Sequence, residues 1–174
     1  IMGNRGEKID FNLYLITDRK QIPPPSWGQI SNLSPFIEDA LKGGVKAVQL
    51  REKGLSGNPL FELAKKLRIL TKKHNAKLLI NDRVDIAMAV DADGVHLGQT
   101  SFSAVDARKL LGSKKLIGVS THSLEEALDA QKQGADFITF GPVFYTQSKA
   151  KYGEPLGIER LCEAAKNVKI PIFA

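Results

Sequence analysis

The sequence holds only one cysteine, Cys162, among 174 residues, which excludes an internal disulfide and a cysteine-cluster metal site. Cys162 lies in the helical pattern "GIERLCEAAK", where we expect a small packing residue. Long apolar runs are also absent, since none reaches the roughly 18 residues that cross a bilayer. The first ten residues, "IMGNRGEKID", lack the apolar segment of a secretory signal. We therefore expect a cytoplasmic protein that does not bind membranes.

The basic residues are in excess, but they do not form a cluster. The formal net charge is +6, from 25 Lys and Arg against 19 Asp and Glu. The lysines are spread through helical segments such as "AKKLRILTKKH", and no basic stripe carries the interleaved aromatic residues typical of nucleic-acid binding. We expect small phosphorylated substrates as partners, and no nucleic acid.

The order of apolar segments predicts an α/β fold. From Leu13 onward, short aliphatic runs alternate with longer segments of helical period, a pattern typical of a parallel sheet covered by helices. The expected strands cover residues 13–17, 47–51, 77–81, 94–98, 116–120, 137–141 and 170–174. The expected helices cover residues 34–43, 58–75, 84–90, 103–112, 123–133 and 157–167. Ser123 and Glu126 predict a capping box, and Asn58-Pro59 predicts a helix start.

Polar residues follow the expected strands directly, and each strand is a nearly continuous apolar run, as in strands buried on both faces. In a (β/α)8 TIM barrel these strand ends meet at one rim, where active sites lie, so the pattern favours an enzyme. A Rossmann or flavodoxin-like sheet is the competing architecture, but no G-x-G-x-x-G turn is present.

We expect residues 1–174 to form a single barrel domain that is truncated after the seventh strand. Unpaired strand edges would favour association, and a homodimer is one form it could take.

Six segments in order carry a resemblance to a known family: "VQLREK" (48–53), "INDRVDIA" (80–87), "GVHLGQ" (94–99), "GVSTHSLEEA" (118–127), "GADFITFGPVFYTQSK" (134–149) and "PLGIERL" (155–161). Over residues 13–174 the chain resembles the thiamin phosphate synthase and TenI family of thiamine biosynthesis. The resemblance implies a (β/α)8 barrel with one of two activities. A thiamin phosphate synthase joins hydroxymethylpyrimidine diphosphate to thiazole phosphate and releases pyrophosphate. A TenI-type tautomerase moves a proton to aromatise a thiazole phosphate carboxylate.

Cations after the second expected strand suit a diphosphate, whose expulsion needs positive charge beside the leaving oxygens. The resemblance implies that Gln49, Arg51 and Lys53 contact the pyrimidine diphosphate, and we expect Lys53 to take part in catalysis. The alternative is a solvated salt-bridge cluster around Glu52.

Magnesium is the cofactor expected of a synthase, whereas a tautomerase would need none. The resemblance implies that Asp82 ligates Mg²⁺ with Asn81 beside it, and the alternative is that Asp82 caps the following helix. The family's synthases have a second metal-binding Asp two residues beyond the position of Gln99, but this chain has Ser101 there. A hydroxyl brings no charge to Mg²⁺, which usually binds through one or two carboxylates. This replacement slightly favours the tautomerase.

His122 follows the fifth expected strand, and an imidazole suits proton transfer. The resemblance gives the histidine at this position the acid/base role, while a capping or buried structural histidine is the alternative. His96 lies inside an apolar run, where we expect a structural, hydrogen-bonded histidine. The resemblance also implies that further residues bind substrate, namely Asn81, Gln99, Ser120, Thr146, Ser148 and Lys149.

The sequence thus predicts an enzyme acting on thiazole phosphate, with the tautomerase slightly ahead of the synthase. A barrel that binds thiazole or thiamin phosphate without catalysis is the further alternative, because fold alone does not decide activity.

Overall fold

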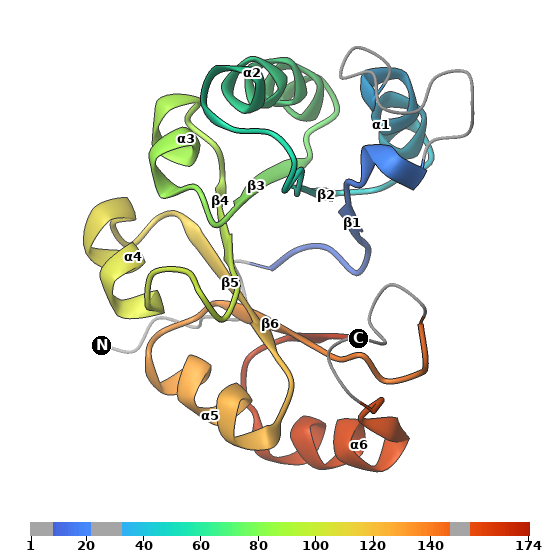
Figure 1. The fold of residues 1–174 in the computed structure, drawn as a ribbon, viewed down its shortest axis with the longest axis vertical. Coiled ribbons are helices and arrows are strands. Elements are labelled where there is room, and N and C mark those ends of the chain that lie inside the picture. Colours follow the sequence, from blue (N-terminus) through green and yellow to red (C-terminus); the bar gives the residue numbers. More distant parts are fainter. Residues whose placement is uncertain (1–8, 22–32, 147–153) are drawn as a thin grey trace. The chain divides into compact units, whose positions relative to one another are not determined.

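A computed structural model describes residues 9–21, 33–146 and 154–174 of the chain (Figure 1). The chain divides into two compact units, one of residues 10–95 and one that contains residues 96–174. Each unit alternates strands with helices, as the sequence predicts. Within these ranges, no helix combines the length and the apolar character needed to cross a bilayer.

The unit of residues 10–95 contains three parallel strands in chain order, β1 (Tyr14–Ile16), β2 (Ala47–Leu50) and β3 (Lys77–Asn81). Its helices are η2 (Arg19–Gln21), α1 (Leu33–Lys42), α2 (Gly57–Lys73) and α3 (Val84–Ala89). Strand β2 is buried along its whole length, as expected for a strand with a neighbour on each side. In the register of the sheet, Gln49 lies beside Ile16 on β1 and Leu79 on β3.

The second unit also has parallel strands in chain order, β5 (Leu116–Thr121), β6 (Phe137–Phe140) and β7 (Ile172–Phe173). Its helices are α4 (Ala104–Leu111), α5 (Leu124–Lys132) and α6 (Gly157–Asn167), and β4 (Gly94–Leu97) crosses the boundary between the units. An apolar cluster packs β6 against α5 and α6 through Ala127, Ala130, Ile138, Phe140 and Ala164.

The expected strands and helices are all present, and each begins and ends within two residues of its expected bounds. Ser123 caps α5 as predicted, because its hydroxyl accepts the Glu126 N–H at 3.1 Å. The short helix η2 was not expected. Helix α2 begins at Gly57, one residue before the expected start.

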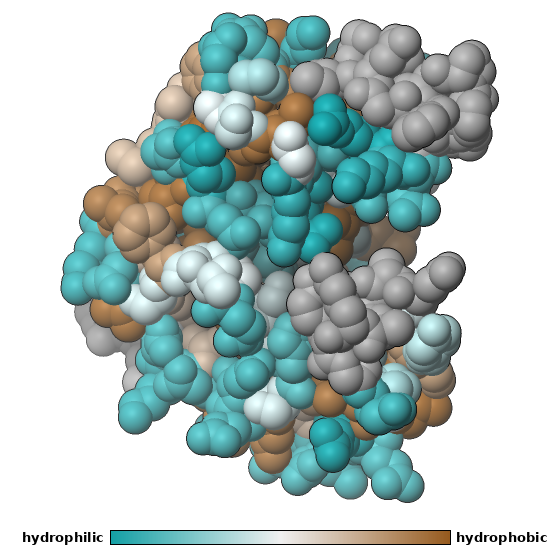
Figure 2. All heavy atoms as spheres, viewed as in Figure 1, coloured by the Kyte–Doolittle hydropathy of each residue, from teal (hydrophilic) through white to brown (hydrophobic). Residues whose placement is uncertain are grey.

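Cys162 is exposed, so the expected packing role is wrong. Ala164 is the buried residue of α6, and a position two residues away lies on nearly the opposite side of a helix. Hydrophilic and apolar residues are interspersed on the face shown in Figure 2, as on most protein surfaces.

A buried aspartate directly precedes β6 and joins three parts of its unit. One Asp136 carboxylate oxygen accepts the Ile117 backbone N–H at 2.8 Å and the Arg108 guanidinium at 2.6 Å. The Asp136 N–H in turn donates to the Ile117 carbonyl at 2.8 Å. The Asp136 side chain is only 3% exposed, so it needs both its cation and its hydrogen bonds.

The unit of residues 10–95 repeats this arrangement before β4. Asp93 accepts the Leu78 N–H at 2.8 Å and the Arg68 guanidinium at 2.6 Å, and its own N–H donates to the Leu78 carbonyl at 2.8 Å. In both units, an aspartate therefore ties the start of one strand to the preceding strand and to a helix that comes before both.

We expect Asp136→Ala to lower the free energy of unfolding by about 3 kcal/mol, because it leaves the Ile117 N–H without its acceptor and Arg108 without its carboxylate partner. Urea unfolding followed by circular dichroism would measure this. Asp39→Ala is the control, since it removes an exposed pair with Lys42 and should change nothing measurable. Equal losses in the two variants would contradict the role given to Asp136.

Candidate functional site

The carboxyl ends of β2 and β3 open into a cavity of about 300 Å³. Parallel strands end at the same edge of a sheet, so residues that follow them meet there. Lys53, Asn81 and Asp82 all line this cavity, together with Leu50, Glu52, Leu55, Leu60 and Arg83. The structure therefore brings together three residues that the sequence singles out.

Two side-chain amides and a carboxylate form a directed chain of hydrogen bonds beside the cavity. Asn81 donates its amide N–H to Asp82 at 2.6 Å, and Gln49 donates to the Asn81 carbonyl oxygen at 2.8 Å. An ionised carboxylate can only accept, which sets the direction of both amides. The Gln49 carbonyl oxygen is left buried, with no hydrogen-bond partner within the described ranges. A buried acceptor in this state costs about 1–3 kcal/mol, so it is suited to a donor from a ligand.

Asp82 is not the N-cap of the helix that follows it. The N-cap of α3 is Arg83, whose side chain forms no capping hydrogen bond. Asp82 instead has φ of 60°, in the left-handed region that a non-glycine residue adopts at a cost of about 1–2 kcal/mol. Such strained positions cluster at functional sites, which favours the ligand-binding interpretation of Asp82 over the capping one.

Arg51 and Lys53 keep their positive charges available. Glu52 lies between them but faces Arg19, whose backbone N–H it accepts at 3.1 Å and whose Nε lies 3.6 Å from its carboxylate. In the part of the chain that the structure describes, neither Arg51 nor Lys53 forms a salt bridge. The alternative of a salt-bridge cluster within "REK" is therefore not observed.

Arg83 is a cation of a different kind, because it is already paired. Its guanidinium binds both carboxylate oxygens of Asp85, at 2.9 and 2.6 Å. These hydrogen bonds hold the pKa of Asp85 below its usual value. The pair leaves Arg51 and Lys53 as the better candidates to bind an anion.

His122 follows β5 with its imidazole exposed, so the alternative of a buried structural histidine is not observed. Its Nδ1 hydrogen-bonds the Gly141 carbonyl oxygen. A carbonyl oxygen can only accept, so Nδ1 carries the proton and, in the neutral ring, Nε2 is the basic atom. The hydrogen bond also orients the ring, as a general acid or base requires.

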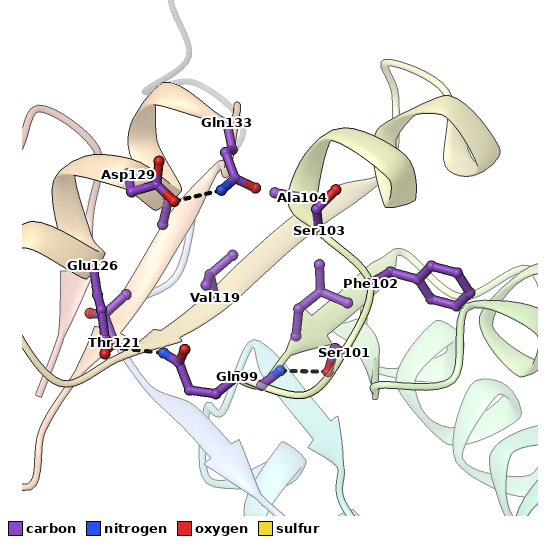
Figure 3. A pocket seen from close by; sticks show the side chains of 13 residues that line it. Gln99, Ser101, Phe102, Ser103, Ala104, Val119, Thr121, Glu126, Asp129 and Gln133 are labelled. Carbon is purple, nitrogen blue, oxygen red and sulfur yellow. Dashed lines mark hydrogen bonds between the residues drawn. The ribbon is translucent and has the colours of Figure 1, made fainter.

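A second cavity, of about 270 Å³, lies beside the loop after β4 and is shown in Figure 3. Gln99 and Ser101 both line it, as do Glu126, Asp129 and Gln133 of α5 and its end. The Ser101 hydroxyl accepts the Gly98 N–H at 2.8 Å, while the Ser101 N–H donates to the Gly98 carbonyl at 3.2 Å. Ser101 thus closes the turn at the position where a synthase is expected to have an acid.

His96 is buried and hydrogen-bonded, as predicted. Its Nε2 lies 3.0 Å from the Ser120 hydroxyl and 3.4 Å from that of Thr139. The Ser120 side chain, expected to bind substrate, therefore also contacts a structural histidine. Gly118 has a role that the sequence analysis missed: a Cβ there would lie 2.7 Å from His96 Nδ1 and 2.3 Å from Phe137. The strand pattern carries no signal for that close approach.

The expected substrate residues after β6 are described only in part. Thr146 is exposed, while Ser148 and Lys149 lie outside the described residues. The structure groups Gln49, Lys53, Asn81 and Asp82 in one unit, and it groups Gln99, Ser101, Ser120 and His122 in the other. That the two groups serve one site stays a prediction.

Comparisons with a family model and with known proteins both point to thiamine-phosphate synthases, over nearly the whole chain. The profile of a family described as thiamine monophosphate synthase matches residues 13–174. A putative thiamine-phosphate synthase of Geobacter sulfurreducens is 56% identical over 167 residues, which cover 96% of this chain and 76% of the relative. A thiamine-phosphate synthase of Clostridium novyi is 44% identical, covering 95% and 78% respectively.

The structure is also similar to a solved one. The thiamine phosphate pyrophosphorylase from Pyrococcus furiosus superposes with a TM-score of 0.80 at 38% identity, over 97% of this chain and 74% of that one. This similarity confirms the α/β barrel class expected from the sequence.

Proposed function

Because the chain belongs to the thiamine monophosphate synthase family of thiamine-biosynthetic enzymes, we propose that it is a thiamin phosphate synthase. It joins hydroxymethylpyrimidine diphosphate to thiazole phosphate and releases pyrophosphate. The names of the relatives favour this activity over the tautomerase that Ser101 slightly favours.

The observation that carries the proposal is the positive charge at the carboxyl end of β2, where Lys53 lines the cavity and Arg51 lies two residues before it. Arg51 and Lys53 have no carboxylate partner among the described residues, and a diphosphate would supply the missing negative charge. Cations placed beside a leaving group stabilise the charge that develops on it. In this proposal Lys53 and Arg51 bind the diphosphate and assist its departure.

Gln49 supports the proposal from the other end of the substrate. Its buried carbonyl oxygen is oriented by the chain through Asn81 to Asp82 and lacks a donor within the described ranges. An N–H group on the pyrimidine is a suitable donor. An enzyme site that hydrogen-bonds a substrate N–H discriminates strongly against an analogue without it, because the buried acceptor is then left unpaired.

Asp82 is the residue proposed to hold Mg²⁺. The described residues include no group of three His, Cys, Asp or Glu side chains suited to a metal ion. Mg²⁺ commonly binds through one or two carboxylates, waters and substrate phosphates, so a single Asp82 carboxylate fits it. The ion would neutralise charge on the diphosphate, while Asn81 keeps Asp82 oriented through its 2.6 Å hydrogen bond.

A tautomerase is the second candidate, and His122 favours it. The imidazole is exposed, and its Nε2 is the basic atom of the neutral ring because Nδ1 donates to Gly141. That arrangement suits a proton transfer on a heteroaromatic ring. Ser101 favours it too, since it gives Mg²⁺ no second carboxylate.

We expect purified protein supplied with Mg²⁺, pyrimidine diphosphate and thiazole phosphate to form thiamin phosphate, measured by chromatography. Lys53→Ala should lower kcat/KM by roughly 10²–10³-fold, because it removes a cation from the leaving group. Lys66→Ala is the matched control, as Lys66 is an exposed lysine of α2, and it should retain full activity. Absence of condensation in the unaltered protein would exclude the synthase, and binding without either reaction would favour the non-catalytic alternative.

Ser101→Asp should raise condensation severalfold at limiting Mg²⁺, because it adds a carboxylate where the family's synthases have one. The new carboxylate can still accept the Gly98 N–H, so the turn should survive. Thr100→Asp is the control, because it adds the same charge one residue away, at an exposed position that is not part of the cavity lining. Equal rates in the two variants would mean that the missing acid is irrelevant.

His122→Asn tests the second candidate. An asparagine amide can still donate to the Gly141 carbonyl but cannot take up a proton near neutral pH. If His122 is the acid/base, exchange of the thiazole ring proton with deuterium, followed by NMR, should fall by about 10²-fold or more. Exchange at an undiminished rate would assign the proton transfer to another group.

A further inference from the structure

One carboxylate oxygen joins the loops that follow β4 and β5. Glu126 Oε2 accepts the His122 backbone N–H at 2.7 Å and the Gln99 side-chain amide at 2.9 Å. Both donors therefore come from residues that the sequence analysis selects for substrate binding or catalysis. Figure 3 shows Glu126 and Gln99 on the wall of the same cavity.

This use of Glu126 departs from the capping box that the sequence predicts. In that motif the Glu side chain returns to the N–H of the cap residue, which is Ser123 here. Ser123 does accept the Glu126 N–H, but the Glu126 carboxylate reaches one residue further back, to His122. The carboxylate thus fixes the backbone of His122 instead of completing the cap.

The same bond sets the orientation of Gln99. Its amide nitrogen donates to Glu126 and, at 3.1 Å, to the Ser120 carbonyl. With the nitrogen engaged twice, the carbonyl oxygen is the atom that Gln99 can offer to a ligand donor. His122 is held in a similar way, by Glu126 at its backbone and by Gly141 at Nδ1, which leaves Nε2 for chemistry.

We propose that Glu126 is a positioning residue that holds Gln99 and His122 for substrate. This inference rests on the proposed function, because it assumes that these two residues meet the substrate. Glu126 does not itself contact the reacting atoms. Its contribution is to hold the Gln99 side-chain amide and the His122 backbone N–H with one charged acceptor. Hydrogen bonds to charged groups are stronger than those between neutral groups.

Three variants of the full chain separate positioning from a general effect of charge. Glu126→Ala removes both hydrogen bonds. Glu126→Gln can still accept the His122 N–H, but it no longer carries the charge that attracts the Gln99 amide. Glu125→Ala is the matched control, because Glu125 is an exposed acid in the same first turn of α5 and offers the same favourable charge to the helix.

The first measurement is hydrogen exchange at the His122 amide, followed by NMR, which requires no activity. Glu126→Ala should speed this exchange about tenfold, whereas Glu126→Gln should retain most of the protection and Glu125→Ala should match the unaltered protein. Unchanged exchange in Glu126→Ala would overturn the proposal. If Glu126→Ala does not fold, the proposal is overturned when Glu126→Gln catalyses condensation or exchange of the thiazole ring proton as fast as Glu125→Ala does.

The second measurement is kcat and KM for condensation and for ring proton exchange. Glu126→Ala and Glu126→Gln should each lower kcat/KM about tenfold at temperatures where both remain folded, and Glu125→Ala should leave it unchanged. Normal kcat/KM in both Glu126 variants would overturn the positioning role. If the unaltered protein catalyses neither reaction, the proposed function fails, and the His122 amide exchange alone then decides whether Glu126 holds the loop.

Discussion

In each unit, the alignment of the parallel strands depends on an aspartate that directly precedes a strand. Asp136 does this before β6 and Asp93 before β4, and each binds the preceding strand and an arginine from an earlier helix. A parallel strand shifted by one residue would turn its side chains to the opposite face. The Arg108–Asp136 and Arg68–Asp93 ion pairs therefore lie where strands begin. The polar side chains whose direction depends on the strand register lie where strands end.

At the ends of β2 and β3, the hydrogen-bond donors and acceptors of the polar side chains determine how these side chains are oriented. Asp82 accepts from Asn81, Asn81 accepts from Gln49, and Gln49 keeps a buried acceptor. Glu52 is occupied by Arg19, which leaves the neighbouring cations Arg51 and Lys53 without a carboxylate in the described ranges. The arrangement offers positive charge and a buried acceptor, which suit the anionic ligand with an N–H donor that we propose.

The chemistry differs between the two units. Residues 10–95 supply cations and the Asp82 carboxylate, which suit a diphosphate. Residues 96–174 supply an oriented imidazole and an amide held by Glu126. Both sets of groups belong to one member of the thiamine monophosphate synthase family. Ser101 is where this chain departs from the pattern that the resemblance implies for a synthase.

The sequence by itself determined the strands and helices, because apolar runs and helical periods are local and strongly patterned. Family motifs likewise identified Lys53, Asn81 and Asp82, whose position at strand ends follows from the order of elements. Cys162 was placed wrongly because helical period alone did not distinguish its face from that of Ala164.

Only the tertiary structure decided which partners the polar groups take. Asp136 meets Arg108 from 28 residues away, and Gln99 meets Glu126 from 27 residues away. Gly118 is required by side chains of two other strands, and the Gln49 oxygen lacks a donor from the described residues because the fold buries it. Hydrogen bonds and close packing depend on distances between segments remote in sequence, which no local pattern records.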